Sequence, residues 1–581
     1  MLVMKRFSLV FLLLLILFSC SDESGQQFEF GGGTVTMALE NEPTTFIARD
    51  VLDIYSATVL HQIMEGLVGF DPKTIKIIPR LATEWTKSDD GKIYIFTLND
   101  DVLFHPHAIF KTEKDRRLTT ADVIKTFEMC CTLNEQGVAP SVYSMIFQSN
   151  VKGADEFLQG KTTKISGITV DGNKIKIELL NEDHNFLDKL AHVNVSILSE
   201  KMIEHGEVND VIGTGPFKYS KYTHGDHPSI VLLKNKDYYK KDDAGNALPY
   251  LDSLVFVFQS RKLEQLDMFE SGKIDLIIGL PTNRITRMLE GRIEDFNSKP
   301  PKLVLANNPL LETHFYYFNM EDERFQNPLV RKAFNYAIDK KVIGREILRN
   351  QFYDLGEYGL TPPILLALKG YDFKSVKAAG YSYNPELAKK LLAQGGYPNG
   401  EGFGSVELRY NINDIHSAVA DEFSKQIFKT LGINVNIDGS TFEQLNDDGA
   451  NGKGDIFRMG WAADYPSPES FLMNFYGKFV PVDSLEISPI NKARYKNPVF
   501  DEFYEQAQNS KKIADQMRLF SIAEVELLKN PPIIPLWYSG NVQITNSYLR
   551  NFYFNAIGFF DFREVYIKEW SHEEYKETYN Y

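Results

Sequence analysis

Strand-type and helix-type segments alternate along the whole chain, and this mixture constrains the fold more than any other feature. Residues 34–39 alternate polar and apolar side chains as a strand does, whereas residues 56–67 place apolar side chains at helical spacing. Two turn signals, Asp89-Asp90-Gly91 and Asp171-Gly172-Asn173, each lead into a strand-type segment and predict hairpins. The 581 residues contain no repeat period and no coiled-coil heptads, and this length suggests about three domains. We therefore expect an α/β or α+β protein with several lobes.

The N-terminus has the layout of a bacterial secretory signal. Two basic residues precede an apolar run at residues 9–18, and Cys20 follows the run with one residue, Ser19, between them. The run is short for a helix that crosses a bilayer, which needs about 20 apolar residues. We expect residues 1–19 to be a lipoprotein signal peptide, Cys20 to carry the lipid, and residues 20–30 to be a flexible tether. A single N-terminal membrane anchor helix is the alternative.

The chain is acidic, with a formal net charge of −15 at pH 7. Removal of residues 1–19 removes two basic residues and no acid, which takes the net charge to −17. Such a chain is unsuited to nucleic acid, because phosphates require clustered Lys and Arg. After Cys20, Cys130 and Cys131 are the only cysteines, and adjacent cysteines rarely bridge each other without strain. We expect two buried thiols on a helix, with no disulfide and no metal site.

The segment from Gly460 to Pro468 places an Asp, two aromatic residues and prolines at the end of a predicted strand. Residues 455–459 alternate polar and apolar side chains, which predicts a strand that brings Arg458 and Trp461 toward the region of Asp464. A cation and an anion only a few residues apart suit a zwitterionic ligand. The same residues also fit a strand end that is closed by a turn and carries a surface Asp.

Short motifs in a fixed order extend over nearly all of the chain after residue 30. They include Glu65-Gly66-Leu67-Val68, Gly213-Thr214-Gly215-Pro216-Phe217, Leu248-Pro249-Tyr250-Leu251-Asp252, Asn327-Pro328-Leu329-Val330-Arg331, Tyr383-Asn384-Pro385, Gly460 through Pro468 and Pro531-Pro532-Ile533-Ile534-Pro535. Each motif alone is weak, but the ordered set resembles the family-5 extracellular solute-binding proteins. These are the oligopeptide- and dipeptide-binding receptors of ABC importers.

The resemblance implies a fold and a division into lobes. The fold would be α/β, of the bilobed type II periplasmic-binding-protein kind, with an extra small lobe and a cleft that closes at a hinge. Lobe I would be discontinuous and would comprise residues 31–68, 195–303 and 546–581. Residues 69–194 would form the small lobe II, and residues 304–545 would form lobe III. An extended peptide would lie between the lobes.

The resemblance also implies which residues bind the ligand. Asp464 corresponds to the Asp that holds the ligand α-ammonium, Arg458 to an Arg that can meet the ligand carboxylate, and Trp461 to a Trp that lines a side-chain pocket. The remaining ligand-binding positions are Gly460, Ala462, Leu52, Asp53 and Ile54, the last three through backbone that pairs with the ligand main chain.

The implied function is that of a substrate-binding lipoprotein. It would capture short peptides and deliver them to the permease subunits of an ABC transporter. We expect a monomer without cofactor, catalytic activity or nucleic-acid partner. It would be held at the bacterial cell envelope by the lipid on Cys20, on the periplasmic or outer face of the membrane.

Other functions remain open at this point. The family that the chain resembles includes receptors for nickel, haem, opines and oligosaccharides, and a peptide-sensing surface receptor could use the same fold. His105 and His107 could suggest a metal, but two His without further ligands are more often structural. A periplasmic hydrolase is least favoured, because the sequence contains no Gly-Xaa-Ser-Xaa-Gly elbow, no His-Glu-Xaa-Xaa-His helix and no Walker loop. Asp464 favours a ligand with an ammonium group over a sugar.

Overall fold

The computed structural model describes residues 31–134, 137–206, 210–225, 227–281, 284–463, 465–483 and 485–579. The predicted signal peptide, Cys20, the whole predicted tether and Asp464 therefore lie outside the described residues. Within the described part, no helix is long and apolar enough to cross a membrane.

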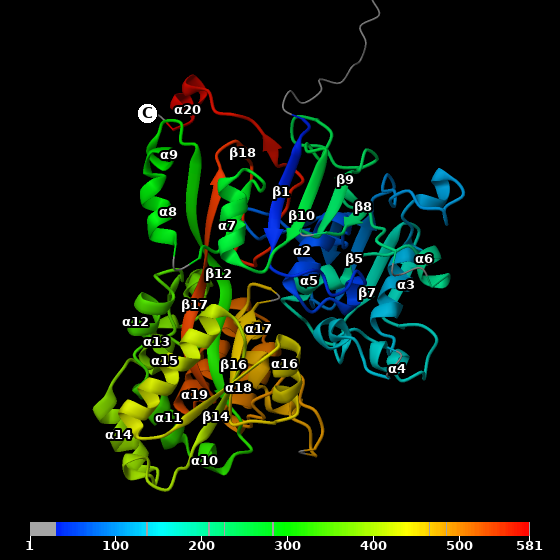
Figure 1. Cartoon of the computed structure of the whole chain (residues 1–581). Helices are drawn as coiled ribbons and strands as arrows, with labels where there is room; N and C mark the ends of the chain where they lie inside the picture. The colour runs from blue at the N-terminus through cyan, green and yellow to red at the C-terminus, as the bar shows by residue number, and fades with distance from the viewer. Residues whose placement is uncertain are drawn as a thin grey trace, which may run out of the picture.

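One eleven-stranded sheet runs through most of the molecule. In spatial order its strands are β15 (Val435–Ser440), β14 (Val406–Asn411), β16 (Ile456–Ala462), β12 (Leu303–Phe318), β17 (Ile533–Asn546), β11 (Leu276–Ile278), β1 (Thr34–Leu39), β10 (Ser253–Phe258), β9 (Ser229–Lys234) and β8 (Phe217–Thr223), with β13 (Asp354–Leu355) paired to β17. β12 and β17 are long antiparallel strands that pass from one half of the molecule into the other (Figure 1). Their pairing shifts register between Pro309 and Thr313. These two strands therefore connect two halves that each have their own core.

The half built on β1 is a sheet with a core on each face, and we call it the β1 lobe. It contains β1 and β8 to β11. Successive side chains of β10 point to opposite faces, so that Phe256 packs with α2 (Ile54–Ile63) whereas Val257 packs with α7 (Lys262–Glu270). Helices α8 (Ile285–Gly291) and α9 (Ile293–Asn297) cover the same face as α7 (Figure 1). The C-terminal elements β18 (Leu549–Arg550), β19 (Tyr566–Ile567) and α20 (His572–Tyr579) follow β17 at the same end of the molecule.

A small lobe lies beside the β1 lobe. Its antiparallel sheet has the order β4 (Ala82–Lys87), β5 (Ile93–Leu98), β7 (Lys174–Glu178) and β6 (Ile168–Asp171). Its helices are α3 (Thr120–Cys130), α4 (Ala154–Leu158), α5 (Phe186–Leu190) and α6 (Glu200–Glu204). Both predicted hairpins are confirmed, since β4 pairs with β5 and β6 with β7, and Gly91 and Gly172 take the positive φ angles that these turns require. Cys130 and Cys131 are buried free thiols at the end of α3, as predicted.

The half built on β16 also has a core on each side of its sheet, and we call it the β16 lobe. Helices α11 (Pro328–Ala337), α14 (Pro385–Gln394) and α15 (Asp414–Leu431) pack on one side, and α18 (Pro498–Gln508) and α19 (Ile513–Lys529) pack on the other. Asn384 caps α14 by accepting a hydrogen bond from the Leu387 N–H at 3.1 Å, and Pro385 is the first helical residue. The predicted α/β class is confirmed. The lobe boundaries predicted at residues 303/304 and 545/546 remain a prediction.

Candidate ligand-binding site

Strand β16 positions the candidate residues at one edge of the sheet. β14 and β15 are parallel to each other, and β16 is parallel to β14, so the C-terminal ends of the three strands meet at the same edge. In open α/β sheets this edge is where ligands bind. Arg458, Gly460 and Ala462 share one face of β16 and lie opposite Tyr316, His314 and Glu312 of β12.

The Arg458 guanidinium is fixed by two side chains. Its Nη1 donates to Asn411 Oδ1 at 3.2 Å, and its Nη2 donates to His314 Nδ1 at 2.7 Å. Its Nε is buried and has no hydrogen-bond partner among the described residues. Burial lowers the pKa of Arg458 to about 10, which leaves the side chain cationic at neutral pH. The site therefore holds a positive charge and a buried Nε–H donor that no described protein atom accepts.

Gly460 makes this arrangement sterically possible. A Cβ at this position would lie 2.7 Å from Arg458 Nη2 and 3.1 Å from His314 Nδ1, inside normal contact distance. The hydrogen bond between Arg458 and His314 thus passes directly over the glycine. A side chain at residue 460 would push the two groups apart.

Glu312 and His314 form the second half of the cluster, and the sequence prediction missed both. His314 Nε2 lies 2.8 Å from Ser539 Oγ and 3.3 Å from Glu312 Oε1. Its ring stacks on Trp537, with centroids 4.3 Å apart and ring planes 14° apart. Burial alone would raise the pKa of Glu312, but His314, Ser539 and Arg458 lower it to about 2. Two ionisable residues within an otherwise largely apolar strand were the signal that could have identified them.

Trp461 lies on the other face of β16. It pairs with Thr313 and packs against the core that contains Phe457 and Phe471. The expectation that the strand brings Arg458 and Trp461 to the same region therefore needs correction, since residues three apart on a strand point to opposite faces. Trp461 Nε1 is buried without a hydrogen-bond partner among the described residues. Asp464 is outside those residues, and its neighbours Ala463 and Tyr465 are both buried.

Leu52, Asp53 and Ile54 lie at the start of α2 in the β1 lobe. Leu52 is 77% exposed and Ile54 48% exposed. The Asp53 carboxylate caps the helix, accepting hydrogen bonds from the Ser56 N–H at 2.8 Å and from the Ser56 and Thr44 hydroxyls at 2.6 Å. Pairing of this backbone with a ligand remains a prediction.

Tyr55 connects this segment with the β12 cluster. Burial raises its pKa, and the carboxylates of Glu40, Asp53 and Glu312 raise it further. Glu312 of β12 and Asp53, the N-cap residue of α2, therefore both lie within electrostatic reach of the Tyr55 phenol.

The small lobe contacts the β16 lobe at Ser467, Glu469 and Ser510. Asn185 donates to Glu469 Oε2 at 2.5 Å and to Ser467 Oγ at 3.4 Å, and His184 Nε2 lies 2.7 Å from the Ser510 carbonyl oxygen. Lys189 Nζ lies 3.8 Å from Glu469 Oε1, and both side chains are nearly buried. These contacts hold the two lobes together in this structure.

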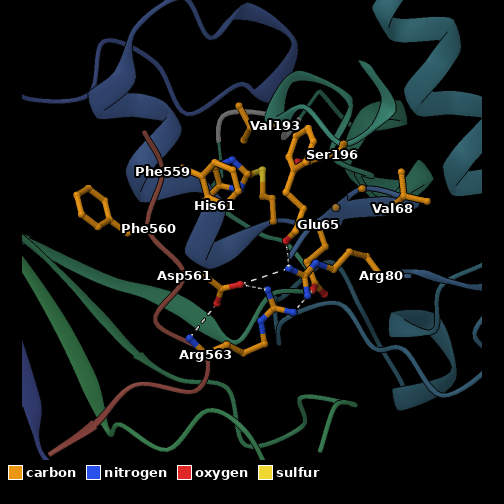
Figure 2. Close-up of a pocket in the computed structure, with 15 residues that line it drawn as sticks. His61, Glu65, Val68, Arg80, Val193, Ser196, Phe559, Phe560, Asp561 and Arg563 are labelled. Atoms are coloured by element: carbon orange, nitrogen blue, oxygen red, sulfur yellow. Dashed lines mark hydrogen bonds and ion pairs between the residues drawn. The ribbon is translucent and has the colours of Figure 1, made fainter. Parts of the chain in front are cut away.

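A charged cluster at the junction of the β1 lobe and the small lobe encloses a cavity (Figure 2). Arg80 Nη2 lies 3.3 Å from Asp561 Oδ2, and Tyr238 donates to Glu65 Oε1 at 2.8 Å. Burial raises the pKa of Glu65 and of Asp561. The cavity measures about 30 Å³, which accommodates water but no larger solute. This cluster joins lobes and is not the candidate ligand site.

His105 and His107, the two residues that could suggest a metal, interact with different partners. His105 is buried: it accepts a hydrogen bond from the Gly213 N–H at 3.3 Å and donates one to the Gly215 carbonyl at 3.0 Å, within the motif Gly213-Thr214-Gly215-Pro216-Phe217. His107 pairs with Asp210 at 3.1 Å. Among the described residues, no group of three or more His, Cys, Asp or Glu could hold a metal ion.

Comparisons with known proteins agree with this architecture. The family described as bacterial extracellular solute-binding proteins, family 5 Middle, matches residues 76–480. The oligopeptide-binding protein OppA of Bacillus subtilis is 24% identical over 582 residues, which covers 97% of this chain and 100% of that protein. Heme-binding protein A of Haemophilus influenzae is 26% identical over 493 residues, 82% of each chain. The structure of DppA from Helicobacter pylori in complex with peptide STSA has a TM-score of 0.75 at 23% identity and covers 93% of this chain and 99% of that chain.

The fold is thus that of a bilobed type II periplasmic binding protein, as predicted. Because the family match extends over more than half of its length, the chain belongs to the bacterial extracellular solute-binding proteins of family 5.

Proposed function

We propose that this protein is the substrate-binding lipoprotein of an ABC importer, and that it captures short peptides between its lobes and delivers them to a membrane permease. Membership of a solute-binding family supports the proposal. So do the relatives, of which one is named an oligopeptide-binding protein and another is described in complex with a peptide. The observation that carries it is the position of the cationic Arg458 near the end of β16, six residues before Asp464.

The proposed mechanism uses the groups that all peptides share. Asp464 holds the ligand α-ammonium and Arg458 meets the ligand carboxylate, and such charge-assisted contacts are about twice as strong as neutral hydrogen bonds. The ligand main chain pairs with the backbone of residues 52–54 as an added strand. Affinity therefore depends little on the ligand sequence.

Side chains of the ligand would enter wide, hydrated pockets. Gly460 and Ala462 line the face of β16 that carries Arg458, and Trp461 lines a side-chain pocket on the opposite face. Bridging waters adapt to different ligand residues at a cost of about 0–2 kcal/mol each. Closure of the lobes around the peptide presents a new surface to the permease, in a hinge-type population shift. No catalytic group and no cofactor is part of this mechanism.

The proposed location follows from the N-terminal sequence. A lipid on Cys20 holds the protein at the bacterial cell envelope, on the periplasmic or outer face, and residues 20–30 let it move near the permease. We propose that it acts as a monomer. The formal net charge of −15 argues against a nucleic-acid partner.

Calorimetric titration with a tetrapeptide and with its N-acetylated form tests the proposal. Wild-type protein should bind the free peptide, and acetylation should weaken binding by at least about 100-fold, because removal of the charged partner of a desolvated ion pair costs about 3–5 kcal/mol. The affinity of Asp464→Asn for the free peptide should be lower than that of the wild type by the same factor, and its melting temperature should be unchanged. Asp438→Asn, which alters an exposed carboxylate on β15, is the matched control. Full affinity in a folded Asp464→Asn variant would reject that assignment, and no binding of any peptide by the wild type would reject the peptide proposal.

A further inference from the structure

The proton positions in the β12 cluster follow from its donors. A guanidinium can only donate, so His314 Nδ1 must accept the 2.7 Å hydrogen bond from Arg458 Nη2. A neutral imidazole that accepts at Nδ1 carries its proton on Nε2. That nitrogen lies 2.8 Å from Ser539 Oγ and 3.3 Å from Glu312 Oε1, both of which can accept. Glu312 and Ser539 therefore select the tautomer that Arg458 needs.

The ring is also held in place sterically. The His314 ring stacks on Trp537. It also lies so close to Gly460 that a Cβ at residue 460 would be only 3.1 Å from His314 Nδ1. His314 cannot turn its ring without losing both hydrogen bonds. The imidazole is therefore a rigid support for the guanidinium, which is the arrangement that precise ligand recognition requires.

The other charged and titratable groups around the ring come from β12 itself and from two further elements, β16 and α15. Arg458 comes from β16, and Tyr316 of β12 lies opposite it. His416 of α15 has its ring centroid 6.4 Å from that of His314, and burial lowers its pKa to about 2, so it stays neutral. Glu312 is the anion of the cluster. Burial lowers the pKa of His314 itself, and this favours the neutral ring.

We propose that His314, supported by Glu312 and Ser539, is a positioning residue that aims the Arg458 guanidinium at the carboxylate of the ligand. The buried Nε–H of Arg458 is the donor that the described protein atoms leave without an acceptor. Asn411 and His314 each accept one hydrogen bond from a terminal nitrogen, and the two bonds together fix the plane of the guanidinium and the direction of its Nε–H. The inference rests on the proposed function, because it needs a ligand with a carboxylate.

The arrangement has a pH dependence with a defined sign. Protonation of His314 places a hydrogen on Nδ1, which then faces the Arg458 N–H, and the attraction becomes a repulsion. As the pH falls, the guanidinium loses its support and the affinity for a free carboxylate should fall. Affinity for a C-terminal amide should change little, since it does not use this charge.

Calorimetry with a tetrapeptide acid and its C-terminal amide tests the proposal. We expect the wild type to prefer the acid, and His314→Phe, which keeps the stacking but has no acceptor, to lose about tenfold of that preference. His314→Asn, whose side-chain oxygen can stand near the position of Nδ1, should restore most of it. His224→Phe, which changes an exposed His that contacts the ring of Tyr222 outside the site, should behave as wild type.

A structural role alone would weaken both peptides equally, whereas a positioning role changes their ratio. A folded His314→Phe variant with the wild-type ratio would overturn the proposal. If that variant does not fold, His314→Asn still decides, because a folded His314→Asn variant that has lost the preference for the acid also overturns the proposal. A wild type that binds neither peptide refutes the proposed function, and the assignment of His314 falls with it.

Discussion

The contact between the small lobe and the β16 lobe gives a sharp prediction about closure. Glu469 of α17 (Pro468–Leu472) accepts the side-chain amide of Asn185 at 2.5 Å and lies 3.8 Å from Lys189 Nζ. The side chains of Glu469 and Lys189 are 8% and 10% exposed. Burial disfavours the charge on Lys189, but Asp183 and Glu469 raise its pKa above the ordinary value. Glu469→Gln should therefore weaken the closed arrangement of the lobes.

The magnitude follows from the bonds that the variant keeps. A hydrogen bond to a charged group contributes about 1.5–3 kcal/mol. We take the lower end, about 1.5 kcal/mol, because Lys189 retains Asp183 at 2.9 Å and a Gln can still accept from Asn185. This shifts the balance between open and closed forms about tenfold toward the open form. A ligand that binds only the closed form should lose up to about the same factor in apparent affinity.

Small-angle scattering and calorimetry together measure this effect. The radius of gyration of the ligand-free Glu469→Gln protein should increase, and saturating ligand should return it to the wild-type value. Glu502→Gln, which alters an exposed carboxylate of α18, is the control. The reasoning is refuted if Glu469→Gln folds normally and keeps both the wild-type radius of gyration and the wild-type affinity.

Three further predictions concern stability. Burial lowers the pKa of His105 from 6.5 to about 4, so the unfolded chain takes up a proton before the folded protein as the pH falls. Protonation at this residue should therefore lower the unfolding free energy by about 2.5 kcal/mol between pH 7 and pH 4.5. Urea titrations in which His105→Asn loses as much stability over this range as the wild type would contradict the prediction. Glu524 is fully buried and accepts hydrogen bonds from the Leu360 and Thr361 N–H groups, the Thr361 hydroxyl and Tyr371. Glu524→Gln should therefore lower the unfolding free energy by about 2 kcal/mol. An unfolding free energy equal to that of the wild type in urea titration would speak against this prediction. A Cβ at Gly213 would lie 2.1 Å from the Ile63 carbonyl oxygen, so Gly213→Ala should destabilise the fold by about 1–3 kcal/mol. A Cβ at Gly291 would meet open space, so Gly291→Ala should not destabilise the fold in this way. Equal melting temperatures for the two variants would contradict this prediction.

Local features of the fold were predictable from the sequence. The two hairpins depend on Asp-Gly and Gly-Asn turns, and α14 begins at an Asn-Pro pair whose side chain and fixed φ act within one helical turn. The bend at Gly213 was also predictable, because glycines and a proline permit few other paths. The carbonyl of Ile63 that fills the space beside Gly213 was not, since it comes from a distant part of the chain.

The candidate site was predictable on β16 but not on its neighbours. Arg458 and Gly460 could be identified from one segment, whereas His314 lies 144 residues away and reaches Arg458 only through the pairing of β12 with β16. The contact of Asn185 with Glu469 joins residues 284 apart. Such partners are set by tertiary packing, which no local pattern in a single sequence encodes.

Mass spectrometry of the ligand carried by the purified protein tests the central claim most directly. A soluble form that begins at Ser21 would be isolated without refolding, denatured, and its small-molecule fraction analysed. Peptide binding predicts a heterogeneous set of short peptides with free termini, which Asp464→Asn protein should lack. A single non-peptide species, such as haem or a metal complex that is retained equally by Asp464→Asn, would contradict the account.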